Sequence, residues 1–211
     1  MATEFFGIYS KSVGLFEDPT ITNAFKKSPI LFSQIMYSYF QNAIPLFNNP
    51  IKIQDVLENQ NEPSGETEIF EGDGTTTYTI TTIPVVNSLF QYIVNEVIVD
   101  GNYDSINNTI TFQTVIPIGQ TGSFQWYFPG DFINTLDNSV QNILARLLVL
   151  NWAEKEKNFL LDIRRMLQDT DYKLGSEANS IRSKDNWVAN MNTEAKRLMN
   201  KYAWGLQYKK N

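Results

Sequence analysis

A change of hydrophobic period along the chain constrains the fold most. Over Ile133–Leu150 the apolar residues recur every three or four positions, as they do on one face of an α-helix. A second stripe of the same spacing covers Val188–Tyr202. Between residues 67 and 128 the apolar residues instead alternate with polar ones, which is typical of strands. The sequence therefore predicts helices on both sides of a β-rich insertion.

Residues 20–48 add a further predicted helix before the insertion. Ser28 followed by Pro29 is typical of an N-cap and the first helical position. Pro45 is expected to kink or end this helix, since proline removes a backbone donor. The expected buried face consists of Leu31, Ile35, Tyr39, Ala43 and Phe47.

The insertion reads as a small antiparallel sheet or sandwich with expected strands over 75–83, 93–99, 108–116 and 123–128. Before them, Gly72-Asp73-Gly74-Thr75 could form a phosphate or cation loop. It lacks the lysine of a P-loop and the spaced acids of a calcium loop, so a hairpin turn is the favoured interpretation.

These patterns predict an α+β fold, in which a small antiparallel β domain is inserted into a bundle of three to four helices. We expect an N-terminal helical part over 1–62, the β domain over 63–129, and a C-terminal helical part of the same bundle over 130–211.

Composition excludes several chemistries. The 211 residues contain no Cys and no His. A disulfide framework, a thiolate zinc site, a cysteine nucleophile and a Ser-His-Asp triad are therefore impossible. We expect no catalytic residues, cofactor or metal, and thus no enzyme. A hydrolase that works with two carboxylates alone stays open as an alternative, since Asp and Glu are present.

Targeting signals are not evident. No segment approaches the roughly 20 apolar residues that a membrane span requires, and Met1-Ala2-Thr3-Glu4 lacks the basic start of a signal peptide. The expectation is a soluble, non-secreted protein without a membrane partner.

Charge is divided unevenly along the chain. Residues 50–150 hold two basic and twelve acidic groups, whereas residues 151–211 hold twelve basic and eight acidic groups. No Lys or Arg lies between Lys52 and Arg146. Nucleic-acid binding depends on cations, so the middle region is not expected to bind DNA.

The basic C-terminal region allows three interpretations: a solvated helix face, a nucleic-acid contact, or a docking surface for an acidic partner. A neighbouring copy of the chain could supply such an acidic surface from its own middle region. Aromatic residues such as Trp187 and Trp204 are interleaved with the cations. The candidate interaction residues are Arg164, Arg165, Lys196, Arg197, Lys201, Tyr208, Lys209 and Lys210.

Several segments resemble a known class of proteins. Residues 70–80, which begin with Phe70 and contain the Gly72–Thr75 turn, resemble the opening of small β domains in structural proteins of tailed phages. Val97–Gly101, Asn108–Phe112 and Pro117–Gly119 match the strand end, strand and turn that follow there. The flanking stretches are similar to those of head-to-tail connector proteins of crAss-like phages; they are residues 17–19, 40–47, and the run from Trp152 through 171–173 and 176–179.

The resemblance implies a non-enzymatic virion protein, assembled in the host cytoplasm and located at the junction of neck and tail. It implies a dodecameric ring that binds the portal and other neck or tail proteins and extends the channel for genome ejection, through which DNA passes without specific binding. The alternatives are a tail or baseplate component, a carboxylate-based hydrolase acting on polysaccharide, and a host-directed binding module that uses the β domain.

Overall fold

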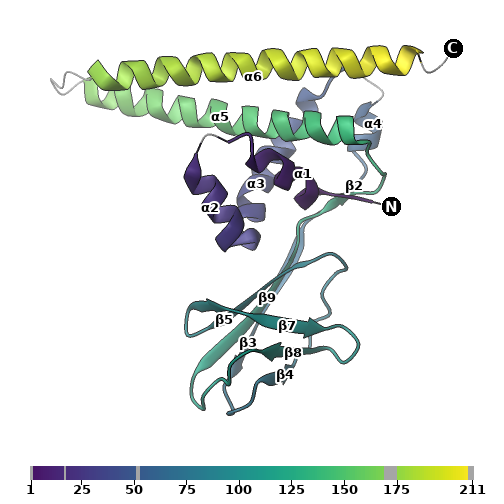
Figure 1. Cartoon of the computed structure of the whole chain (residues 1–211), viewed down its shortest axis with the longest axis vertical. Helices are drawn as coiled ribbons and strands as arrows, with labels where there is room; N and C mark the ends of the chain where they lie inside the picture. Colours follow the sequence, from purple (N-terminus) through teal and green to yellow (C-terminus); the bar gives the residue numbers. More distant parts are fainter. Residues whose placement is uncertain (1, 17, 51–52, 169–174, 209–211) are drawn as a thin grey trace.

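A computed structural model describes residues 2–16, 18–50, 53–168 and 175–208 (Figure 1). In the two longest helices the structure describes side chains only up to residue 158 and over residues 182–206. The helices are α1 (Phe5–Val13), α2 (Pro19–Lys27), α3 (Pro29–Ala43), a 3-10 turn η1 (Ile44–Leu46), α4 (Gln54–Leu57), α5 (Asn138–Gln168) and α6 (Gly175–Tyr208). The strands are β1 (Thr3–Glu4), β2 (Gln60–Asn61), β3 (Ser64–Glu71), β4 (Thr77–Thr79), β5 (Leu89–Val94), β6 (Val97–Val99), β7 (Gly101–Asp104), β8 (Thr109–Phe112), β9 (Thr121–Phe128) and β10 (Asp131–Phe132).

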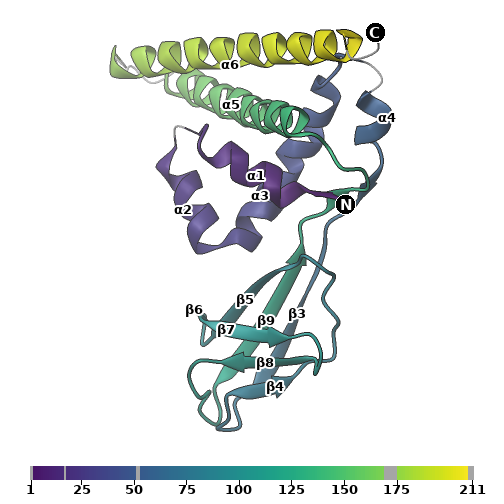
Figure 2. The same ribbon diagram turned by 45° about the vertical axis from the view of Figure 1, so that its right-hand side comes forward.

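This is the α+β architecture that the change of period predicts. Helices α3, α5 and α6 pack together, and α1 also packs against α5. The strands β3 to β9 are inserted between α4 and α5 in the chain. They form a separate lobe below the helices, on the side opposite α6 (Figures 1 and 2).

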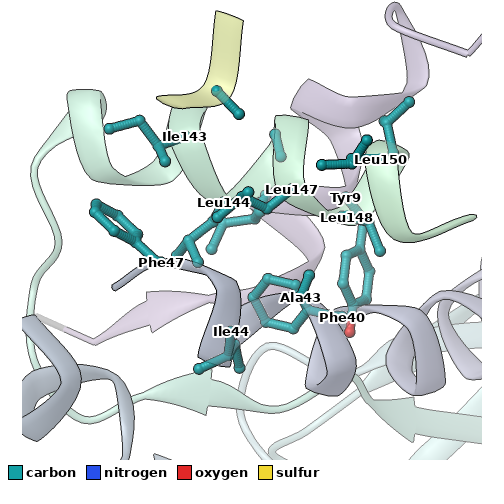
Figure 3. Packing of buried hydrophobic residues seen from close by; sticks show 14 of the residues in the cluster. Tyr9, Phe40, Ala43, Ile44, Phe47, Ile143, Leu144, Leu147, Leu148 and Leu150 are labelled. Atoms are coloured by element: carbon teal, nitrogen blue, oxygen red, sulfur yellow. The ribbon is translucent and has the colours of Figure 1, made fainter. Parts of the chain in front are cut away.

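The two helical stripes are buried inside the subunit. In α5, Ile143, Leu144 and Leu147 are each at most 2% exposed and pack against residues of α1, α3 and η1 (Figure 3). In α6, Val188 and Ala195 are buried in the same core. Burying such side chains contributes roughly 1.5–3 kcal/mol each. Because the chain itself covers both stripes, neither remains available for another subunit.

Several helix predictions need correction. The stripe was expected to begin at Ile133, but α5 starts at Asn138, and Ile133 precedes it and is 55% exposed. Of the expected buried face, Ala43 and Phe47 are buried, but Leu31 and Ile35 are exposed. Helix α3 instead buries Ile30, Phe32, Met36 and Phe40. Apolar residues occur almost all around α3, so its periodicity does not single out one face. Packing against α1 and α5 makes that choice.

Other helix predictions are confirmed. Pro29 is the first residue of α3, with Ser28 at the N-cap. The α-helix ends at Ala43 and continues as the 3-10 turn that contains Pro45. Helix α1 was not expected from the sequence, although Phe5, Ile8 and Tyr9 fill the centre of the helical core.

The β lobe consists of two antiparallel sheets that share a second core. One has the strand order β3-β9-β5-β6 and the other β4-β8-β7. Phe124 and Phe128 of β9 face Ile110 and Phe112 of β8, and Ile80 completes this group of buried residues. The alternation predicted along residues 123–128 therefore gives the correct buried face. Along 108–116 it is correct for Ile110 and Phe112, but the strand ends at Phe112 and Thr114 is exposed.

The segment 93–99 was expected to be one strand, and this is wrong. It contains the hairpin between β5 and β6, with Asn95 and Glu96 at φ values of 50° and 66°. A two-residue hairpin turn with both central residues at positive φ matches the twist of the strands it joins. Asn95 is the sequence signal for this turn, but the β-branched residues on both sides of it favour the prediction of one continuous strand.

A small three-stranded sheet joins the two lobes, with the order β1-β10-β2. Asn61 of β2 donates a 2.8 Å hydrogen bond to Asp131 of β10. The backbone N–H of Phe5 donates to the carbonyl of Gly130 at 3.0 Å. The N-terminus therefore holds the chain segments that enter and leave the β lobe.

Candidate interaction surfaces

The Gly72–Thr75 segment is a turn that satisfies its own polar groups. Asp73 accepts hydrogen bonds from the backbone N–H of Thr75 at 2.9 Å and from its hydroxyl at 2.7 Å. Gly74 has a φ of 84°, which glycine adopts without strain. The expected hairpin is not correct in detail, because this turn links β3 and β4, which belong to different sheets.

A carboxylate next to this turn ties the two sheets together. Glu68 of β3 accepts hydrogen bonds from the backbone N–H of Thr81 at 2.9 Å and of Thr82 at 3.3 Å. Both hydroxyls donate to the same carboxylate at 3.2 Å. Burial alone would raise the pKa of Glu68, but these hydrogen bonds outweigh it and lower the pKa below its ordinary value.

The pKa values of three carboxylates in the β lobe argue against the hydrolase alternative. Hydrogen bonds also lower the pKa of Asp73, chiefly from Thr75, and the pKa of Asp104, chiefly from Asn107. A glycosidase needs a general acid with a raised pKa. Glu68, Asp73 and Asp104 are shifted in the opposite direction and serve as anchors for turns and loops.

The described part of α6 presents a cationic face. Over residues 182–206 the exposed charged residues are all positive: Arg182, Lys196, Arg197 and Lys201. The two acids of this stretch, Asp185 and Glu194, are less exposed and lie in ion pairs with α5. The structure thus brings together three predicted interaction residues, Lys196, Arg197 and Lys201, at the C-terminal half of one helix.

The other predicted interaction residues fall outside the side chains that the structure describes. Arg164 and Arg165 belong to α5 and Tyr208 is the last residue of α6, but their side chains lie outside the described ones. Lys209 and Lys210 fall outside the described residues altogether.

Ion pairs divide the three cations into two kinds. Glu194 contacts Arg146 of α5 at 3.1 Å and Arg197 at 3.8 Å, so Arg197 belongs partly to the link between α5 and α6. Among the described residues, Lys196 and Lys201 take part in no salt bridge. These two lysines are therefore free to attract an external acidic group.

The end of α6 is firmly attached to the helical lobe. Burial, together with the charge of Asp137 and the hydrogen bond that Asp137 accepts from its hydroxyl, raises the pKa of Tyr202 to about 12. Asn49 donates to Asn200 at 2.8 Å. Beyond this anchor, Trp204 is 61% exposed. The sequence shows Trp204 among the basic residues, but only the structure distinguishes it from the buried Trp126 and Trp152.

The β lobe carries the opposite charge. Residues 64–128 contain seven acidic groups and no Lys or Arg. The helical lobe lies between this acidic lobe and the exposed face of α6 (Figures 1 and 2).

The described residues offer little sign of other kinds of site. Within the described ranges, no group of three or more Asp or Glu residues is placed to hold a metal ion. No helix in the described part of the chain is both long and apolar enough to cross a membrane. Comparison with known proteins finds no family model that matches the chain and no matching curated protein.

Proposed function

We propose that this chain is a structural protein of a tailed-phage virion that forms a homo-oligomeric ring in the neck. The ring would join the portal to the tail and extend the channel through which the genome leaves. The proposal begins with the resemblance of Gly72–Thr75, Val97–Gly101 and Asn108–Phe112 to phage structural proteins, and the resemblance implies twelve copies.

The strongest support for the proposal is the separation of opposite charges across the subunit. The exposed charges of α6 over residues 182–206 are positive, and the β lobe over 64–128 has acids without cations. Opposite patches on different sides of one subunit attract one another between copies. Repeated head-to-tail contacts of this kind close into a ring when the rotation between copies allows it.

Passage of DNA is compatible with the same charge distribution. A ring lined by the acidic lobe would repel the phosphate backbone and give a moving genome few places to adhere. The partners are thus other copies of the chain, the portal protein and other neck or tail proteins, with DNA as a passing cargo.

The test is the assembly state of the purified chain, alone and mixed with the portal protein. We expect rings by negative-stain electron microscopy and a matching mass by light scattering, with weaker assembly at high salt because the attraction is screened. A monomer under all conditions, including with the portal, would overturn the proposal. Antibody labelling of virions at the distal tail, instead of the neck, would favour the tail or baseplate alternative.

A further inference from the structure

The exposed end of α6 has the composition of a contact site. Trp204 is 61% exposed, and Lys201 precedes it by one helical turn. Tryptophan is enriched among the residues that dominate binding energy at protein interfaces. The anchor at Tyr202 fixes this turn, so little conformational entropy is lost when it binds.

A row of isoleucines crosses the outer face of the four-stranded sheet. In the strand register, Ile69 of β3 lies opposite Ser123 of β9, Ser123 opposite Ile93 of β5, and Ile93 opposite Ile98 of β6. Directly opposite residues point to the same face of a sheet. Ile69 is 69% exposed and Ile98 is 51% exposed, so this face is apolar and uncovered.

Acids flank this row at the far end of the sheet. Ile69, Ile93, Glu96 and Ser123 line a hollow of about 530 Å³ on the outer face. Glu71 follows Ile69 by two residues in β3, so it points to the same outer face of the sheet, and it is exposed. The hollow therefore combines two isoleucines with the carboxylate of Glu96, and Glu71 lies beside it on the same face of the sheet.

We propose that this hollow receives the Lys201–Trp204 turn of a second copy of the chain. The indole would cover the isoleucines, and the ammonium group of Lys201 would meet Glu71 and Glu96. This proposal rests on the proposed ring and specifies the contact between its neighbours. The turn cannot reach the hollow of its own chain, because the helical lobe separates α6 from the β lobe (Figures 1 and 2).

Such a contact is heterologous: each copy offers one turn and one hollow. Two variants of the full chain separate these roles. Lys201→Ala combined with Trp204→Ala removes the contact groups of the turn, and Glu71→Lys combined with Glu96→Lys reverses the charge of the hollow. All four positions are exposed or lie at a hairpin turn, so both variants should retain the far-ultraviolet circular dichroism of the wild type.

The experiment is sedimentation velocity at low and high salt. Wild type should assemble, and each variant alone should associate at least about 30-fold more weakly, the loss expected for a hot-spot residue. Mixed together, the two variants should form a dimer that grows no further, because only one intact turn and one intact hollow remain. Lys26→Glu, which reverses an exposed charge of α2 outside both α6 and the β lobe, is the matched control and should assemble like wild type.

The outcomes separate this contact from the ring itself. Rings formed by both variants as readily as by wild type would overturn the proposed contact and leave the proposed ring standing. Absence of a dimer in the mixture, when each variant alone is monomeric, would also overturn it. A wild-type chain that does not self-associate at any salt concentration would overturn the contact, and assembly with the portal would then decide the proposed ring.

Discussion

Gly130 sits where the β lobe meets the helices, and an added methyl group should destabilise the chain strongly. Its φ is 91°, and a Cβ atom there would lie 2.7 Å from the ring of Phe5 and 2.8 Å from the carbonyl oxygen of Asn61. The Phe5 ring cannot easily retreat, because it is fully buried, with its centroid 5.0 Å from that of Phe40 and 4.9 Å from that of Phe132.

The magnitude of the Gly130→Ala effect follows from two costs. Left-handed backbone costs an L-residue about 1–2 kcal/mol, and forcing a methyl group into a packed core costs about 1–3 kcal/mol. We therefore expect a loss of roughly 2–5 kcal/mol in the free energy of unfolding. Gly119→Ala is the matched control, since Gly119 has a φ of 83° and nothing within 4 Å of its added Cβ.

Urea unfolding followed by circular dichroism measures both variants. Gly119→Ala should lose only the backbone part, about 1–2 kcal/mol, and Gly130→Ala should lose measurably more. Equal losses would mean that the contacts with Phe5 and Asn61 do not constrain this position, and the reasoning about the junction would be refuted.

Three further predictions concern the core, the loop anchor and DNA. Leu148→Ala removes a fully buried side chain of α5 and should cost about 2–5 kcal/mol in a chemical denaturation series; a loss below 1 kcal/mol would contradict the packing described for α5. Glu68→Gln should lower stability by roughly 1–2 kcal/mol at neutral pH, because the partly exposed carboxylate accepts charge-assisted hydrogen bonds. The pKa of Glu68 is lowered by folding, so this contribution is present above the ordinary pKa and is lost as pH falls through the folded value; a wild-type advantage that persists at pH 2 would disprove the assignment. Replacing both Glu71 and Glu96 by Gln should leave the affinity of the full chain for duplex DNA equal or higher, because these carboxylates repel the phosphate backbone. A lower affinity of that variant in a gel shift would show that the acidic lobe contacts DNA.

The sequence by itself determined the class of fold and the location of the insertion. Regular spacing over Val140–Leu150 and Val188–Ala195 identifies faces that are buried in the structure, because a helix brings every third and fourth residue to one side. Alternation over 123–128 does the same for a strand. Charge division is also a property of the sequence, since no Lys or Arg occurs between positions 52 and 146.

The tertiary structure decided what local patterns leave ambiguous. The buried face of α3 depends on α1 and α5, because apolar residues surround that helix. The junction sheet joins residues 3–4, 60–61 and 131–132, whose pairing no short-range pattern encodes. The candidate contact surfaces arise in the same way: Trp204 is a surface residue because α5 covers a different face of α6, and Ile69, Ile93 and Ile98 form one row only because strands distant in sequence are paired in that register. Exposure and cross-strand neighbours depend on which elements meet, and that is settled by packing of the whole chain.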